Sequence, residues 1–193
     1  MLGLKLPTDP RWANIAEKNI AEILIDHAWC EQKAATMAIS LIVTNPDKTE
    51  LIDEMTSLAR EEMGHFKMVT EKLKQYNIKL GPQRPDEYAK KLYQFFQKGG
   101  SRTDGLVHSL LVAALIEARS CERFRLLSEN LSNPELAKFY FDLMKSEAGH
   151  YTMFLKFARQ YDDIEKVNKK WQSLLEFEAQ VMEEMGTLER IHG

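Results

Sequence analysis

The chain has 193 residues, 44% hydrophobic and 28% charged, a composition typical of one globular domain and not of a disordered chain. Its 26 basic and 29 acidic residues give a net charge of -3, which excludes a strong attraction of the whole molecule to nucleic acid. We expect one domain over residues 1–193.

The N-terminal stretch MLGLKLPTDPRW has neither the apolar core of a secretory signal nor the composition of a transit peptide. No apolar run along the chain approaches the roughly 18 residues that a membrane helix needs. The two cysteines, Cys30 and Cys121, form no CxxC pair, which argues against a disulfide framework and against a rubredoxin or zinc-ribbon module. We therefore expect a cytoplasmic protein that has no contact with a membrane.

The first half of the chain is predicted to be helical almost throughout. Apolar residues recur at helical spacing up to about Val43, and Asn45 followed by Pro46 is typical of a capped helix start. A loop rich in glycine and proline follows the second helix, and Gly99 with Gly100 is a stop signal for the third. The predicted helices cover residues 9–43, 46–76 and 86–97, with the loop over 77–85.

The second half has the same helical character. Thr103 or Asp104 is expected to begin a long helix, and Asn133 with Pro134 repeats the capped start of another. The predicted helices cover residues 103–129, 134–161 and 164–190. The pattern is four long helices in two pairs, with a connecting helix between the pairs and an extra helix at the C-terminus. It predicts an all-α, ferritin-like four-helix bundle with a long crossover.

Two segments contain the motif Glu-x-x-His, at Glu62 to His65 and at Glu147 to His150. Residues three apart lie on the same face of a helix, so each motif can aim a carboxylate and an imidazole at one metal site. A single match is unspecific, but both segments also share an inner glycine and a trailing aromatic residue. The repetition indicates a metal centre built from two similar halves.

The inner glycines, Gly64 and Gly149, are unusual inside helices because glycine there costs about 0.5–1 kcal/mol relative to alanine. We expect that a side chain at these positions would obstruct a neighbouring helix or the metal ligands.

A di-metal site of this kind also needs one glutamate from the partner helix of each pair. Glu31 precedes Glu62 by 31 residues and Glu117 precedes Glu147 by 30, which lets an antiparallel hairpin bring them level. The offset between halves is 86 residues for these glutamates and 85 for both members of the Glu-x-x-His pairs, which indicates a duplicated helix pair. The predicted ligands of two iron ions are Glu31, Glu62, His65, Glu117, Glu147 and His150.

Glu122 is a rival to Glu117, because Cys121-Glu122 resembles Cys30-Glu31. That pairing requires an offset of 91 residues, so Glu122 would lie more than a helical turn off level, and we prefer Glu117. Glu122 is then a candidate hydrogen-bond partner for a histidine ligand. His27 lies one turn before Glu31, where a buried histidine with a hydrogen-bond partner is a better interpretation than a ligand.

With this ligand pattern, the chain resembles the ferritin-like di-iron carboxylate proteins. Within them it is similar to the tRNA hydroxylases that act on 2-methylthio-N6-isopentenyladenosine, the modified purine next to the anticodon. The segment at 115–124 makes the narrower match, and the Glu-x-x-His pairs alone indicate only the superfamily. The matching segments are DHAWCEQKAA at 26–35, REEMGHF at 60–66, LIEARSCERF at 115–124 and SEAGHY at 146–151.

The resemblance implies an oxygen-dependent monooxygenase with a non-haem di-iron centre that hydroxylates the isopentenyl group. It implies O2 as co-substrate, an external electron donor such as a reductase, and the tRNA anticodon stem-loop as partner. By the same analogy Glu62 and Glu147 would bridge the irons, with Glu31 and Glu117 as terminal ligands. No residue has the pattern of a separate general base, so no catalytic residue is expected beyond the metal ligands.

Two other functions remain open at this point. A ferritin-like or rubrerythrin-like protein that reduces peroxide or oxidises iron would have the same ligands, although the chain lacks a cysteine-rich electron-transfer module. A metal-free helical interaction module is the other alternative.

A protein of net charge -3 needs a local basic surface to hold tRNA. The basic residues nearest the predicted ligands in sequence are expected to form it. They are Arg119, Arg123, Arg125, Lys138, Lys145, Lys156 and Arg159.

Overall fold

The computed structural model of the chain describes residues 2–96, 99–186 and 190–191, and every regular element among them is an α-helix. These helices are α1 (Arg11–Lys18), α2 (Ile20–Thr44), α3 (Thr49–Gln75), α4 (Glu87–Phe95), α5 (Arg102–Asn130), α6 (Pro134–Tyr161) and α7 (Ile164–Met185). In this part of the chain, no helix has the length and hydropathy needed to cross a bilayer.

The chain divides into two compact units. One unit contains α2 and α3, in residues 18–85 with the short C-terminal stretch 190–191. The other contains most of α1 and all of α4 to α7, in the described residues of 2–17 and 86–186. A single domain over residues 1–193 stays a prediction.

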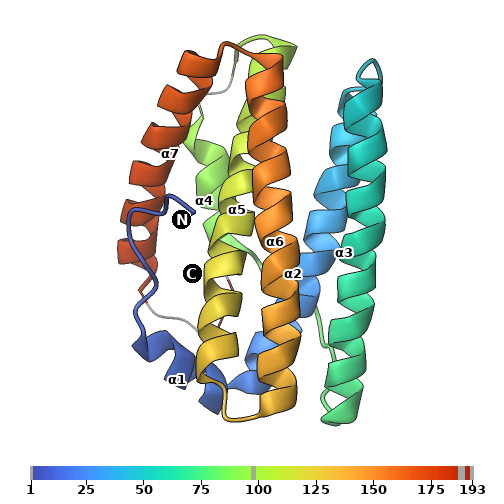
Figure 1. The fold of residues 1–193 in the computed structure, drawn as a ribbon, viewed down its shortest axis with the longest axis vertical. Helices are drawn as coiled ribbons and strands as arrows, with labels where there is room; N and C mark the ends of the chain where they lie inside the picture. The colour runs from blue at the N-terminus through green and yellow to red at the C-terminus, as the bar shows by residue number, and fades with distance from the viewer. Residues whose placement is uncertain (1, 97–98, 187–189, 192–193) are drawn as a thin grey trace. The chain divides into compact units, whose positions relative to one another are not determined.

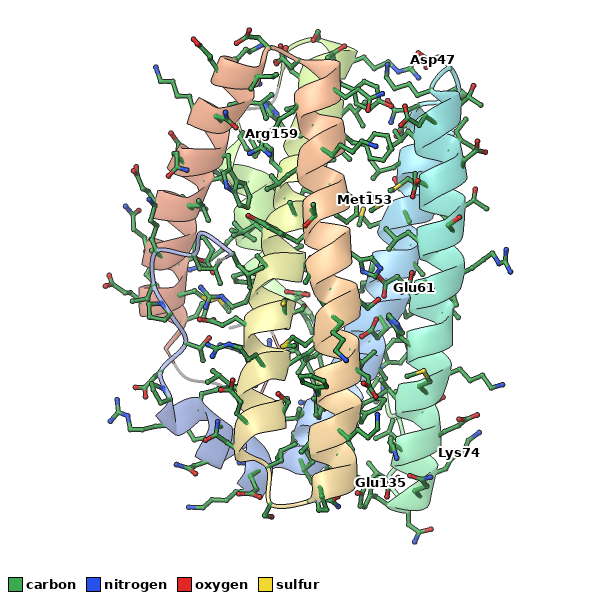
Figure 2. The ribbon with its side chains drawn as sticks, in the orientation of Figure 1. Asp47, Glu61, Lys74, Glu135, Met153 and Arg159 are labelled. Carbon is green, nitrogen blue, oxygen red and sulfur yellow. The ribbon has the colours of Figure 1, made fainter. Side chains whose placement is uncertain are left out.

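In the smaller unit, α2 and α3 form an antiparallel hairpin (Figure 1). Asp47 marks the turn between them, and Lys74 lies at the far end of α3 (Figure 2). Apolar side chains spaced at helical intervals are buried in both helices, and the rings of Trp29 and Phe66 pack at 6.4 Å between centroids. The hairpin therefore brings the middle of α2 level with the middle of α3.

Two predicted boundaries in this region are wrong. The helix expected over 9–43 is broken at Asn19, whose backbone leaves the helical region (φ -123°, ψ 36°), so that α1 and α2 are separate helices in different units. Asparagine favours such breaks because its side chain competes with the helical hydrogen bonds. Asn45 ends α2 instead of capping the next helix, because its buried amide donates to the Leu41 carbonyl at 3.0 Å. The next helix, α3, begins at Thr49.

The larger unit is organised around α5. Figure 1 shows α5 and α6 as an antiparallel pair, and Phe124 contacts Tyr140 between them at 5.4 Å. The ring of Trp171 on α7 lies 6.1 Å from that of Tyr151, and Phe177 on α7 stacks on Phe95 of α4 at 4.7 Å. Most residues of α5 from Leu106 to Phe124 are buried, including polar ones, so this helix has no extended solvent face in that stretch.

The predicted boundaries in the larger unit are mostly confirmed. Asn133 caps α6 by accepting hydrogen bonds from the backbone amides of Glu135 and Leu136, with proline in the first turn. The helix predicted over 86–97 ends at Phe95, and residue 97 lies outside the described residues. The last helix was expected to reach residue 190 but ends at Met185, because Gly186 adopts a left-handed φ of 68° that stops it.

Candidate metal centre

The α2–α3 hairpin brings three of the predicted ligands together. Glu62 and His65 lie three residues apart on α3, and His65 Nδ1 is 3.3 Å from Glu62 Oε2. Across the hairpin, the same nitrogen lies 3.4 Å from Glu31 Oε2. One ligand atom from each of the three residues lies within 4.8 Å of the others, and all three side chains are buried. This half-site offers two carboxylates and one imidazole to a cation.

The buried groups of this half-site share protons. Burial raises the pKa of the Glu31 carboxyl to about 8, and the neighbouring Glu62 charge adds to this effect while the hydrogen bond with His65 opposes it. Burial by itself lowers the pKa of His65, but hydrogen bonds with Glu31 and Glu62 outweigh it and raise that pKa to about 10. At neutral pH, protons on Glu31 and His65 therefore reduce the negative charge of this buried cluster, in the position where a metal cation would do so.

His27 supports this half-site from one turn earlier on α2. Its Nε2 lies 2.5 Å from Glu31 Oε1, and the imidazole is fully buried. The hydrogen bond expected for a buried histidine is thus present, and its partner is a predicted ligand. Such a contact fixes the orientation of the carboxylate.

The α5–α6 pair brings together the other three predicted ligands. Glu117 lies near the middle of α5, and Glu147 and His150 lie three residues apart near the middle of α6, whose ends are marked by Glu135 and Arg159 (Figure 2). One ligand atom from each lies within 4.8 Å of the others. All three side chains are buried, with exposures of 4%, 3% and 6%. The larger unit thus repeats the donor set of the smaller one.

Glu122 lies in a different cluster from Glu117. Its carboxylate accepts hydrogen bonds from the Thr8 amide at 3.1 Å and the Thr8 hydroxyl at 2.7 Å, and it also pairs with Arg119. Arg119 in turn donates to Glu178 on α7 through Nε at 2.9 Å and Nη2 at 2.6 Å. The suggestion that Glu122 hydrogen-bonds a histidine ligand is therefore wrong, because threonine and arginine occupy its acceptor atoms.

Two members of the predicted basic surface are not on the surface. Arg119 has no exposed area and Arg123 has 1%, and the Arg123 guanidinium lies 4.6 Å from the centre of the Trp12 ring. Neither can reach a phosphate, so this part of the prediction is wrong. No local pattern in the sequence predicts this burial, because the partners come from distant parts of the chain: Leu6 and Glu178 contact Arg119, and Trp12 on α1 contacts Arg123.

The inner glycines also differ from expectation. Gly64 and Gly149 are exposed, and a Cβ atom added at either would meet no described atom within 4 Å. Obstruction of a neighbouring helix or of the ligands therefore does not explain these residues, and nothing in the structure does.

The donor chemistry fits iron. Each half-site combines two hard carboxylate ligands with one imidazole nitrogen, a set that suits non-haem iron better than calcium, which prefers oxygen ligands alone. Four carboxylates from the two half-sites would balance the charge of two divalent cations.

The chain is similar to curated tRNA hydroxylases. It is 41% identical to the tRNA 2-(methylsulfanyl)-N(6)-isopentenyladenosine(37) hydroxylase of Pseudomonas putida, over 83% of this chain and 77% of that protein. It is 29% identical to the protein of the same name from Salmonella typhimurium, over 81% of this chain and 75% of that one.

A solved structure gives the fold. A protein from Synechococcus described as having aldehyde deformylating oxygenase activity matches with a TM-score of 0.92 and 34% identity, over 98% of this chain and 95% of its own. This likeness confirms the all-α, ferritin-like fold class expected from the sequence. The profile of one family, described as tRNA-(MS[2]IO[6]A)-hydroxylase (MiaE), matches residues 2–193. With its duplicated half-sites and these relatives, the chain belongs to that tRNA hydroxylase family.

Proposed function

We propose that this enzyme is an oxygen-dependent di-iron monooxygenase that hydroxylates the isopentenyl group of 2-methylthio-N6-isopentenyladenosine next to the anticodon in tRNA. Membership of the hydroxylase family supports the substrate. The observation that carries the chemistry is the pair of buried half-sites, each with two carboxylates and one imidazole.

In this proposal the six predicted ligands hold two irons, three from each unit. They are Glu31, Glu62 and His65 from α2 and α3, with Glu117, Glu147 and His150 from α5 and α6. Bound iron would supply the reduction of O2 with electrons from an external donor, which is the chemistry that hydroxylation of an unactivated carbon requires.

The protein's own residues contribute orientation and charge. His27 holds the Glu31 carboxylate through its 2.5 Å contact, so this ligand is oriented before metal binds. His65 carries a proton between Glu31 and Glu62, and it would have to lose this proton to act as a metal ligand. Burial of all six side chains keeps bulk water from the reacting groups. The proposal needs no catalytic residue beyond the ligands.

The test combines a cellular and a purified assay. We expect tRNA from cells lacking this protein to retain the unhydroxylated nucleoside, and we expect the wild-type gene to restore hydroxylation. Purified, iron-loaded protein with a reductant should place one atom of isotopically labelled O2 in the nucleoside. A long-chain aldehyde is the matched substrate control, because the solved relative is described by that activity.

Variants connect the reaction to the ligands. Glu62→Ala and His150→Ala should lose both iron and hydroxylation, whereas Glu54→Ala, which removes an exposed carboxylate on α3, should lose neither. Unchanged tRNA together with peroxide consumption or iron oxidation would replace this proposal with the peroxidase or ferritin function. Full iron content in both ligand variants would refute the ligand assignment. The cytoplasmic location and the reductase partner remain predictions.

A further inference from the structure

The N-terminal segment, residues 2–8, is fixed against α5 by the buried cluster around Arg119. The Leu6 carbonyl accepts a hydrogen bond from Arg119 Nη2 at 2.9 Å, and Thr8 binds Glu122 through both its amide and its hydroxyl. The cluster is anchored to α7 because Arg119 also binds Glu178. A buried, charge-assisted network of this kind holds a segment that has no helical hydrogen bonds of its own.

A pocket of about 810 Å³ lies between this segment and α5. Residues 2–5 and Pro7 line it on one side, and Cys121, Glu122 and Arg125 line it on the other. Its volume falls within the roughly 300–1,000 Å³ typical of sites for small organic ligands. Both walls come from the larger unit, so the pocket is complete within it.

The walls combine apolar surface with two cations. Leu2, Leu4 and Pro7 provide apolar contacts, and the exposed side chains of Lys5 and Arg125 provide positive charge. Arg125 approaches Glu129 only at 3.4 Å on the exposed surface, where such a pair contributes little. Arg119 lies between the Glu122 and Glu178 carboxylates and offsets part of their charge, so the positive charge that faces the pocket comes from Lys5 and Arg125.

The pocket lies close to a predicted iron ligand. Cys121 in its wall follows Glu117 by one turn of α5, about 6 Å along the helix axis. Burial raises the pKa of the Cys121 thiol to about 11, with the charges of Glu117 and Glu122 adding to this effect and that of Arg125 opposing it. The thiol thus lies within electrostatic reach of both the ligand and the cation of the pocket.

We propose that this pocket is a subsite for a nucleotide adjacent to the modified adenosine in the anticodon loop. Its base would pack against Leu2, Leu4 and Pro7, and its phosphate would lie between Lys5 and Arg125. Single-stranded RNA loops expose unstacked bases beside their phosphates, so a site for them needs a surface that covers a base and cations that contact the backbone. This inference rests on the proposed tRNA substrate and deepens it, because it places the RNA contacts on the N-terminal segment and α5 instead of on Arg119 and Arg123.

The experiment measures binding of a fluorescent anticodon stem-loop to iron-loaded protein, without reductant, across a range of salt concentrations. We expect the double variant Lys5→Gln/Arg125→Gln to bind roughly tenfold to a hundredfold more weakly at low salt. The slope of log Kd against log salt should fall by about one for each lost phosphate contact. The matched control is Lys90→Gln/Lys169→Gln, which removes two exposed charges on α4 and α7.

A second experiment tests the apolar contacts of the subsite. A stem-loop with an abasic nucleotide on one side of the modified adenosine should bind the wild type more weakly. With Leu4→Ala, the same abasic change should cost less, because the base contact is already lost. Equal losses in both proteins would overturn the base contact.

The outcomes separate this inference from the proposed function. If the wild type neither binds nor hydroxylates the stem-loop, the proposed function fails. If the wild type does both and the Lys5/Arg125 variant behaves like its control, the function stands and the subsite is overturned. If the variant binds RNA normally but loses turnover driven by a reductase, the pocket serves a protein partner and the inference is wrong. Equal iron content in all variants checks that the centre is intact.

Discussion

Arg119 Nη2 lies 2.6 Å from Glu178 Oε1, and neither side chain is exposed to solvent. The Tyr88 hydroxyl donates to the same carboxylate oxygen at 3.1 Å, so one buried ion pair joins α4, α5 and α7. Through Leu6 and Thr8 the cluster also holds the N-terminal segment. The helix that carries Glu117 is therefore held in place by the buried charges of Arg119, Glu122 and Glu178, none of which is a predicted metal ligand.

Removal of one partner of this pair should destabilise the fold. In Glu178→Ala the Arg119 charge stays buried with only Glu122 as a carboxylate partner, so the free energy of unfolding should fall by about 3–5 kcal/mol. Urea denaturation measures this. The control Glu176→Ala removes an exposed carboxylate from the same helix and should stay within about 0.5 kcal/mol of the wild type. Equal midpoints for the two variants would contradict the prediction.

His27→Ala should weaken iron binding without removing a ligand. Loss of the 2.5 Å contact leaves the Glu31 carboxylate unoriented, and we expect iron affinity to fall about tenfold to a hundredfold. Competition with a chelator measures the affinity. Thr36→Ala, an exposed change on the same helix, is the control. An affinity equal to that of the wild type would show that Glu31 needs no support from His27.

Glu117→Ala and Glu122→Ala should have opposite effects. Glu117→Ala should lose iron and the oxygen-to-iron absorption of the oxidised centre, because Glu117 lies with Glu147 and His150. Glu122→Ala should keep the iron but lower the free energy of unfolding by about 1–3 kcal/mol, because Thr8 and Arg119 lose their acceptor. Iron analysis beside urea denaturation distinguishes them. Iron loss in Glu122→Ala with a normal spectrum in Glu117→Ala would reverse the assignment.

Alkylation of Cys121 should require strongly alkaline solution. The thiolate is the reactive form, and a pKa of about 11 leaves roughly one thousandth of the thiol ionised at pH 8. The rate should therefore rise about tenfold per pH unit from pH 8 to 10, as the thiol approaches its raised pKa. Mass spectrometry of the modified peptide follows the rate, and urea-unfolded protein is the control, with faster reaction at pH 8. A rate that levels off near pH 9 in the folded protein would contradict the raised pKa.

Local signals predicted much of the fold. The Asn133-Pro134 start of α6 was found because a cap and a proline act on their own helix turn, whatever the rest of the chain does. Asn45-Pro46 looks the same in the sequence, yet Asn45 closes the preceding helix through the Leu41 carbonyl. An asparagine side chain can hydrogen-bond either the start of the next helix or the end of the preceding one. Asn45 takes the second role because its side chain is buried against the end of α2.

The sequence by itself determined the helical class, the duplicated Glu-x-x-His pattern and its family, because helical spacing and repeat offsets are properties of the chain alone. Tertiary structure decided what each charged residue of α5 does. Glu117 and Glu122 are five residues apart with similar sequence surroundings, but one joins Glu147 and His150 while the other binds Thr8 and Arg119. The sequence predicts Arg119 and Arg123 as surface cations, but both are buried: Arg119 by Leu6 and Glu178, and Arg123 beside Trp12 of α1. A charged side chain can be buried when distant segments supply its partners and exclude water, and no local pattern in the sequence specifies those segments.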